Sequence, residues 1–463
     1  MNAQTLLVAM LPEHLLLAGM CVLLLLVIAF ERPRGAYAVS LVAVAAAAVA
    51  ATGLFYSGYA AEPFAGQYSV DPQASLGKAI VLMLAALVIL IARRESEERA
   101  FPILVLSSLY GVCLLLSSDT FLTLFLGLEI MSLPVYVLVL IAYRRAESAE
   151  AALKYLVLGG TASATLLMGV SLLYGATGTL SLAVFAHALD APGTMPAIAV
   201  VLIVVAFFLK AAIVPFHAWA PDAYEAASVP VTAYMATIVK AGVLLAAVRL
   251  FDVAALSSPT IELLALLPLL SIVWGNLAAM RQQSLRRMIA YSSIAHAGYL
   301  FYALLGEGST RFQAIAFYVL VYGLMNVLLF AAVPPDADDA ARDRLDHLKG
   351  LFRRDRFAAL MIAVAMLSLA GIPPFPGFIA KFLIFKNVMA AGHTLYAVLG
   401  LVGSYLGIYF YLRVIQFLFM SAEEQPTITR APGRLALGAS FICLAMSILL
   451  AVFPGWAIGA ALP

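Results

Sequence analysis

The stretch of sequence that decides the fold is residues 203–245, IVVAFFLKAAIVPFHAWAPDAYEAASVPVTAYMATIVKAGVLL. It contains two apolar runs of helical length, each with a single lysine, Lys210 and Lys240. Pro215 lacks a backbone N–H and its ring collides with the preceding turn, so the first helix is predicted to break just after Lys210. A lysine at the centre of a bilayer costs about 2.5–3.5 kcal/mol on insertion scales, and its repeated use predicts that the chain moves charge across a membrane.

The composition of the whole chain supports this reading. Of its 463 residues, 64% are hydrophobic and 11% are charged, whereas soluble domains carry about 25% charged residues. The chain is therefore predicted to be an all-α, polytopic membrane protein. A net charge of +2, without basic runs interleaved with aromatic residues, argues against a nucleic-acid partner. The N-terminal apolar run has no basic start and is not expected to be a cleaved signal.

About 20 apolar residues are needed for one helix to cross a bilayer. By that measure we expect fourteen transmembrane helices. They lie near residues 5–30, 36–56, 75–92, 101–117, 119–142, 152–176, 195–215, 226–250, 259–280, 287–306, 311–333, 357–388, 392–420 and 435–459.

The basic residues of the loops predict the orientation, because cytoplasmic loops are rich in arginine and lysine. They gather in alternate loops, with Arg311 as the exception. These residues are Arg32, Arg34, Arg93, Arg94, Arg99, Arg144, Arg145, Arg281, Arg286, Arg287, Arg342, Arg344, Lys349, Arg353, Arg354, Arg356, Arg430 and Arg434. Both termini are therefore predicted to face away from the cytoplasm. The most charged loop, residues 334–356, is interpreted as a solvated connector, with docking of a soluble partner as the alternative.

Few ionisable residues fall inside the predicted spans. The deepest are Glu129, Lys210, Lys240 and Lys381, while Lys154, Lys386 and Arg413 lie closer to span ends. A carboxylate balanced between burial and a nearby lysine can load and release protons, which is the usual use of an intramembrane glutamate. We therefore predict that Glu129 pairs with a lysine as an electrostatic switch. A purely structural ion pair is the alternative.

A second proline-rich break is predicted in LSLAGIPPFPGFIAKFLIF, just before Lys381. In the first break the lysine precedes the proline, and in the second it follows. We interpret this reversed order as the mark of an inverted repeat, in which broken helices at corresponding positions indicate transport sites. Proline kinks that serve packing alone are the alternative for either break.

Two histidines are candidate proton relays, because imidazole titrates near neutral pH. They are His217, after the first break, and His296, in RRMIAYSSIAHAGY; a packing role is equally compatible with each. Tyr299 and Tyr302 beside His296 are candidates for lining a path. No glycine-rich phosphate loop, CxxC motif or paired histidines are present, so no cofactor is expected on this chain. The three cysteines are interpreted as structural.

Five segments resemble the antiporter-like proton-pumping subunits of respiratory complex I, and among them subunit N most. They are GLEIMSLPVYVL, EAALKYLVLGGTASA, FLKAAIVPFHAWAPDAYEAASVPV, GNLAAMRQQSLRRMIAYSSIAHAGY and LSLAGIPPFPGFIAKF. The resemblance covers roughly residues 100–420, and its specificity comes from the five motifs occurring in order. Lysine at position 381 favours subunit N over subunit M, and the absence of a long lateral helix disfavours subunit L.

The resemblance implies a division of the chain into four parts. Residues 1–100 would hold helices 1–3, residues 101–251 and 259–420 two inverted five-helix repeats with broken helices 7 and 12, and residues 421–463 helix 14. It implies proton transfer by Glu129, Lys210, Lys240 and Lys381, with Lys154 as a further matching lysine. These assignments are what the family suggests for the matching positions.

The resemblance also implies partners. They would be the neighbouring antiporter-like and small membrane subunits, with flavin, iron–sulfur clusters and quinone held in other subunits, in a bacterial inner membrane. Two alternatives remain open from the sequence: a subunit of a multisubunit cation/proton antiporter, and a membrane scaffold whose charges only pair helices.

Overall fold

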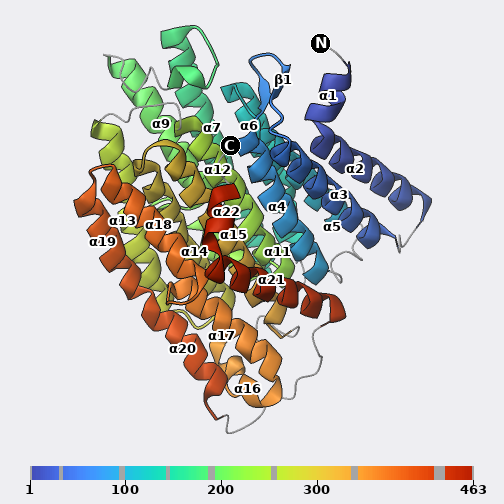
Figure 1. The fold of residues 1–463 in the computed structure, drawn as a ribbon, viewed down its shortest axis with the longest axis vertical. Helices are drawn as coiled ribbons and strands as arrows, with labels where there is room; N and C mark the ends of the chain where they lie inside the picture. Colours follow the sequence, from blue (N-terminus) through green and yellow to red (C-terminus); the bar gives the residue numbers. More distant parts are fainter. Residues whose placement is uncertain are drawn as a thin grey trace.

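Long apolar helices, most of them running side by side along the long axis, build the molecule (Figure 1). The computed structural model describes residues 3–30, 35–92, 100–141, 146–185, 193–251, 258–334, 343–421 and 433–460. Nine of the loop residues that predict the orientation lie outside these ranges: Arg32, Arg34, Arg93, Arg94, Arg99, Arg144, Arg145, Arg342 and Arg430.

The N-terminal half contains a run of helices interrupted by one β-hairpin. Its elements are α1 (Ala3–Ala9), α2 (Leu11–Ala29), α3 (Ala36–Tyr56), β1 (Ala61–Phe64), β2 (Tyr68–Val70), α4 (Pro72–Ile91), α5 (Phe101–Leu116), α6 (Phe121–Ile141), α7 (Ala146–Thr177), α9 (Thr194–Ala211), α10 (Trp219–Ala226), α11 (Val229–Tyr234), the π-helical turn η2 (Met235–Val239) and α12 (Lys240–Phe251).

The C-terminal half is helical throughout the described residues. Its elements are α13 (Ser258–Met280), α14 (Leu285–Tyr302), η3 (Ala303–Leu305), α15 (Gly308–Ala332), η5 (Leu345–Leu348), α16 (Leu351–Arg354), α17 (Arg356–Ala370), α18 (Pro376–Ala390), α19 (Thr394–Leu406), α20 (Ile408–Phe419), α21 (Arg434–Val452) and α22 (Pro454–Ala460). Helix α21 crosses in front of α15 and α4, and packs against both (Figure 1).

The prediction of an all-α, multi-pass membrane protein is confirmed. Within the described residues, twelve helices are long and apolar enough to cross a membrane. The two remaining predicted spans, 101–117 and 357–388, coincide with the shorter apolar helices α5 and α17 and with α18. The total of fourteen therefore stays a prediction. One detail differs, since the loop at 57–74 forms the antiparallel hairpin β1–β2.

Short side chains allow the closest helix contacts in the first half. A Cβ atom on Gly111 of α5 would lie 2.3 Å from the backbone nitrogen of Met131 in α6. One on Gly127 of α6 would lie 2.8 Å from the backbone of Leu115 in α5. Because any larger residue would push the backbones apart, these two glycines set how closely α5 and α6 pack.

The two helix breaks are built in the same way and in the same chain direction. At the first, the N–H groups of Ala212 and Ile213 donate to carbonyls in the last turn of α9. At the second, Gly371 and Ile372 do the same to the last turn of α17. Ala212 and Gly371 both adopt left-handed backbone conformations, with φ of 61° and 79°, and a cis proline lies three residues after each of them.

This geometry corrects the interpretation of the lysine order. Two repeats of opposite membrane topology still match residue by residue in the same chain direction. With the two breaks superimposed in that direction, the position of Lys210 corresponds to Leu369, and that of Lys381 corresponds to Asp222. The reversed order of lysine and proline is therefore no signature of inversion. The two lysines are different sites on similar frames.

The charged segment at 343–356 is folded onto the end of the bundle. Leu345 N–H donates to Gln283 at 2.8 Å, and Gly350 N–H donates to Phe417 at 3.1 Å. Asp343 forms a buried ion pair with Arg286, with 3.2 Å between Oδ2 and Nε. The described part of this loop is thus a packed cap and not a freely solvated connector; docking of a soluble partner stays a prediction.

Two basic residues at the opposite end are hydrogen-bonded or paired inside the protein. Arg311, the exception to the charge pattern, is buried and donates to the carbonyl of Phe251 at the end of α12. Arg249, near the same end, pairs with Asp71 and Asp119. Neither presents a free charge to solvent, so neither weakens the predicted orientation.

Candidate functional site

The first predicted pair forms across three helices. Lys210 Nζ, from the last turn of α9, lies 3.1 Å from Glu129 Oε1 of α6. Ser163 of α7 donates a short hydrogen bond to the same oxygen, and Ser132 Oγ lies 3.4 Å from Lys210 Nζ. Lys210 is 6% exposed and Glu129 is 21% exposed. Although both charges lie within apolar spans, they therefore compensate each other.

The second lysine has a different environment. Lys240 begins α12, directly after the π-helical turn η2, and a π-helical turn within a helix frequently marks a functional site. Its Nζ donates to the backbone carbonyl of Ser293 at 2.5 Å and contacts the hydroxyl of the same residue. That hydroxyl lies 3.2 Å from Tyr224 Oη of α10. Among the described residues, Lys240 has no carboxylate partner.

Helix α14 connects the surroundings of Lys240 to a tyrosine cluster. Ser292, next to Ser293, lies 2.6 Å from Tyr411 Oη. One turn further along α14, His296 Nε2 lies 3.0 Å from the same Tyr411 hydroxyl. His296 Nδ1 lies 2.7 Å from Tyr318 Oη. Both ring nitrogens of the buried histidine are thus engaged with hydroxyl groups that can donate or accept.

The third lysine shares a small cavity with this histidine. Lys381 of α18 lines it together with His296, Tyr318 and Tyr322, and the space is about that of one water molecule. Lys381 Nζ donates to the carbonyl of Ala370, freed by the helix break, at 3.0 Å, and to Ser404 at 3.1 Å. The break therefore supplies backbone acceptors for a buried ammonium group.

Together these residues form what we call the central polar row. It comprises Glu129, Lys210, Lys240, His296 and Lys381, with hydroxyl groups between the last three. Helices α9 and α12, which carry the first two lysines, pack against each other. Lys240, His296 and Lys381 are buried, so this part of the row can bind protons at positions that bulk solvent does not reach.

Lys154 and His217 lie apart from the row. Lys154 is 45% exposed and bonds to Glu150 and Asp222, each at 2.7 Å. Arg287 Nη1 lies 2.8 Å from both Asp222 and Glu225. Burial opposes the ionisation of Asp222, but the hydrogen bonds from Lys154 and Arg287 prevail and lower the pKa of its carboxyl group below the usual value. This cluster is therefore a permanently charged rim at the end of α10.

His217 lies in the first break and faces the outer helix α13. It accepts a hydrogen bond from the indole N–H of Trp274 at 3.1 Å, and its ring also packs near Tyr291. Burial lowers the pKa of the His217 imidazole, so the ring is neutral at pH 7 and Nε2 is free to accept this bond.

The two tyrosines named with His296 differ in role: Tyr299 lies under Lys381, whereas Tyr302 bonds to the backbone of Tyr396.

Sequence reasoning missed several members of the site. Tyr224, Ser293, Tyr318 and Tyr411 complete the row, but single hydroxyl residues are common in apolar helices and give no periodic signal. A second buried acid–base pair, Glu13 with Lys78, was also missed. Lys78 lies within the predicted span 75–92 and could have been found as an isolated charge.

No metal centre is evident in the portion of the chain that the structure describes, which holds no group of three or more histidine, cysteine, aspartate or glutamate side chains placed to bind a metal.

Comparison with known proteins identifies the class. Residues 118–407 match the family described as "NADH:quinone oxidoreductase/Mrp antiporter, TM". The fold is similar to a chain of respiratory complex I from Thermus thermophilus, with a TM-score of 0.84 and 36% identity, covering 97% of this chain and 99% of that one. It is also similar to a chain of an archaeal membrane-bound sulfane sulfur reductase, with a TM-score of 0.88 and 26% identity, covering 98% and 96%. The chain therefore belongs to the NADH:quinone oxidoreductase/Mrp antiporter transmembrane family, and both similar structures are chains of respiratory complexes.

A relative in Pelobacter propionicus narrows the class. It is named NADH-quinone oxidoreductase subunit N and is 39% identical over 422 residues, 91% of each chain. The present chain therefore belongs to the subunit N family of NADH-quinone oxidoreductases.

Proposed function

We propose that this chain is the proton-translocating membrane-arm subunit of a proton-pumping NADH:quinone oxidoreductase. The observation that carries the proposal is the partly buried Glu129–Lys210 ion pair at the start of a row containing two further lysines that are buried. Charges at bilayer depth are costly and are retained chiefly along ion and proton pathways. A chain that only needed to pack helices would gain more from apolar residues at these positions.

The ion pair acts as the switch in this mechanism. While Glu129 lies 3.1 Å from Lys210, the carboxylate stabilises the ammonium form. When charge moves in a neighbouring subunit, the pair loosens, and the buried ammonium group loses its compensation. Lys210 then gives up its proton toward Lys240. Re-forming the pair reloads Lys210.

The hydroxyl groups of the row carry the proton onward. From Lys240 it passes by Ser293 and along α14 to His296, whose two ring nitrogens contact Tyr411 and Tyr318. The small cavity beside His296 then leads to Lys381. Tyr224 joins Ser293 from the side of α10, and the charged rim at Asp222 and Arg287 marks the end of the bundle where protons would enter.

The energy for transport comes from elsewhere in the complex. Each charge moved across the membrane requires about 2.3 kcal/mol per 100 mV of potential, and the drive is quinone reduction in other subunits. Flavin, iron–sulfur clusters and quinone belong to those partners. The neighbouring antiporter-like and small membrane subunits would contact this chain within the bilayer of a bacterial inner membrane, with both termini on the non-cytoplasmic side.

The two halves of the transport unit are proposed to be residues 101–251 and 259–420, flanked by residues 1–100 and 421–463. The matching hydrogen bonds at the two helix breaks support such a division. In each half a left-handed residue is followed by a proline three positions later.

A cation/proton antiporter subunit is the second candidate, because the matched family description includes Mrp antiporters. The subunit N relative at 39% identity favours the first candidate. Sodium-dependent proton movement in vesicles that lack a quinone substrate would support the antiporter instead.

The experiment that tests the proposal uses Lys210→Ala in membranes where a native gel confirms assembly of the complex. Donor-driven quinone reduction and proton uptake into vesicles are recorded together. We expect pumping to fall at least tenfold, and coupled turnover to fall with it. Normal pumping in the assembled variant would contradict the proposal, and loss of assembly alone would support the scaffold reading.

A further inference from the structure

A second acid–base site is buried in the N-terminal helices, outside the central polar row. Lys78 Nζ of α4 lies 2.7 Å from Glu13 Oε1 of α2. Tyr68 of β2 donates to the same oxygen at 2.6 Å and accepts from Lys78 at 2.8 Å. Glu13 is 0% exposed and Lys78 is 1% exposed. These three residues are called the Glu13 site below.

One oxygen of this site is available to a proton. Glu13 Oε1 accepts both hydrogen bonds, whereas the buried Oε2 has no hydrogen-bond partner among the described residues. An unpaired carboxylate oxygen away from water is unfavourable, because its lost hydrogen bonds to water are not replaced. A pair that served only to hold α2 against α4 would be expected to satisfy both oxygens. Protonation of Oε2 removes its negative charge while Lys78 keeps its contact with the residue.

The hairpin covers the site. Tyr68 and Val70 of β2 form an apolar cluster with Ala9, Met10 and Leu54, which closes the site from the end of the bundle. Between Tyr68 and Val70 on the same strand, Ser69 points to a different network. Since side chains alternate along a strand, β2 links the Glu13 site on one face to that network on the other.

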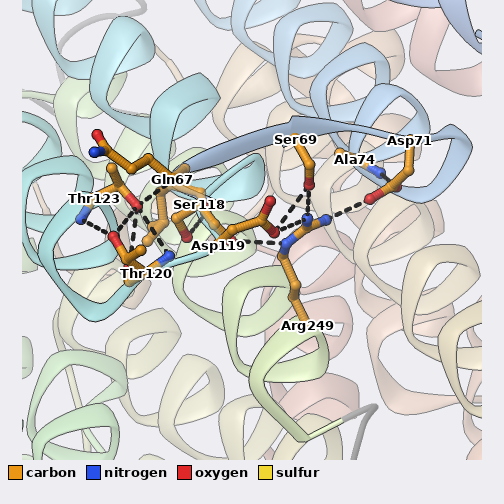
Figure 2. Close-up of polar contacts among 10 residues, drawn as sticks. Gln67, Ser69, Asp71, Ala74, Ser118, Asp119, Thr120, Thr123 and Arg249 are labelled. Carbon is orange, nitrogen blue, oxygen red and sulfur yellow. Dashed lines mark hydrogen bonds and ion pairs between the residues drawn. The ribbon is translucent and has the colours of Figure 1, made fainter. Parts of the chain in front are cut away.

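Figure 2 shows this second network, which we call the Arg249 cluster. Arg249 Nη1 lies 2.6 Å from Asp71 Oδ2, and Nη2 lies 2.7 Å from Asp119 Oδ1. Ser69 contacts the guanidinium group and donates to Asp119 at 2.9 Å. Arg249 also donates to the carbonyl of Ser118 at 2.9 Å. Two other segments of the chain, residues 69–71 and 118–119, therefore meet at Arg249 of α12.

The charges of the Arg249 cluster do not cancel. Two carboxylates face one guanidinium group, so its formal charge is −1. The Glu13 site is neutral as an ion pair and becomes +1 when Glu13 gains a proton. In a medium of low dielectric constant, the excess negative charge of the Arg249 cluster attracts positive charge. The same excess attracts the proton toward the hairpin side when it is released.

The remaining neighbours place the Glu13 site next to the transport unit. Tyr110 and Cys113 of α5 are close enough to Glu13 for electrostatic interaction. Cys113 also interacts electrostatically with Tyr234, the residue that precedes the π-helical turn leading to Lys240. Helix α4 packs against that turn and against α12. The Glu13 site therefore lies on helices that pack directly against the turn leading to Lys240.

We propose that Glu13, Lys78 and Tyr68 form an additional proton-binding site between the central polar row and the hairpin side of the membrane, closed by the hairpin that Arg249 clamps. The step is a simple transfer: Glu13 Oε2 takes one proton from the protein interior and later releases it past the hairpin, and Lys78 stays an ammonium group throughout. This inference rests on the proposed function, because it needs a source of translocated protons.

The test uses infrared difference spectroscopy on the whole complex, comparing the resting enzyme with the enzyme during donor-driven turnover. We expect a carbonyl band of a buried carboxylic acid that Glu13→Gln removes. Tyr68→Phe should shift the band to higher frequency, because it removes the hydrogen bond to Oε1. Gly19→Ala is the packing control: its Cβ would lie 2.6 Å from that of Ala43, and the band should persist.

Proton counting accompanies the spectra. In assembled complex, Glu13→Gln should lower the number of protons pumped per electron at least twofold, and Gly19→Ala should not. If Glu13→Gln does not assemble, the band shift in Tyr68→Phe decides the question. A wild-type spectrum without the band, a band that survives Glu13→Gln, or an unchanged proton count would overturn the proposal in favour of a structural ion pair. Lys210→Ala is measured in parallel to distinguish a failure of this inference from a failure of the proposed function. Normal pumping in that variant contradicts the proposed function itself.

Discussion

Replacing Glu129 by glutamine is expected to block proton transfer while leaving the shape of the site almost unchanged. Glutamine keeps an oxygen that Ser163 can bond, but it removes the negative charge 3.1 Å from Lys210 Nζ. Taking away one member of a buried ion pair costs about 3–5 kcal/mol, because the other charge is left uncompensated. Since 1.36 kcal/mol corresponds to a tenfold change, a cost of this size is enough to slow proton transfer through the pair at least tenfold.

The assay is proton uptake by vesicles containing assembled complex, together with quinone reduction. Glu129→Gln should lower pumping at least tenfold, whereas Glu129→Asp, which keeps the charge, should retain part of it. Glu150→Gln is the matched control, because it makes the same substitution in a pair whose glutamate is 69% exposed. Pumping at the wild-type level in assembled Glu129→Gln would refute the reasoning that the pair is the switch.

Three further predictions concern other parts of the site. Gly377→Ala places a Cβ 1.8 Å from the carbonyl oxygen of Ser368, so the second break should be forced apart and the thermal midpoint of the complex should fall. Gly438→Ala, which has open space around it, is the control and should behave as wild type. Equal midpoints for the two variants would show that the break tolerates a side chain. Asp222→Asn should weaken pumping by a factor that is constant between about pH 6 and 8, because the lowered pKa of Asp222 keeps its carboxyl group ionised throughout that range. The contribution of Asp222 is lost only as the pH falls below about 3.9. A factor that varies with pH between about 6 and 8 would contradict this prediction. Tyr411→Phe removes hydrogen bonds to Ser292 and His296, each worth about 1 kcal/mol. Pumping should therefore slow severalfold, with assembly intact by native gel. An unchanged pumping rate would show that protons do not pass by Tyr411.

The residues that could be predicted from the sequence are those that stand out locally. A single charge in some twenty apolar residues marks Glu129, Lys210, Lys240 and Lys381, because such a charge is costly unless it is used. The two helix breaks could also be predicted, because a proline inside an apolar run interrupts the helix.

The residues that could not be predicted depend on contacts between distant segments. Ser292 and Tyr411 are 119 residues apart in the chain and meet through their hydroxyl groups. The Glu13–Lys78 pair escaped because Glu13 lies near the start of a span, where a charge is unremarkable by sequence alone. The identical hydrogen bonding of the two breaks was hidden as well. KAAIVPF and LAGIPPF agree at four of seven positions, but the lysines on opposite sides of the two prolines suggest a mirrored alignment that conceals this match.

The central claim is that protons pass along the buried lysines, and Lys240→Met tests it most directly. Lys240 bonds to Ser293 and has no carboxylate partner among the described residues. Its removal therefore interrupts the row without leaving an unpaired charge, and methionine fills a similar volume. The measurement is the number of protons pumped per electron in complex whose assembly is verified by native gel. The account predicts that this number falls while the assembled complex remains as abundant as wild type. An unchanged number would mean that protons do not pass through Lys240, and the central polar row would then be structural.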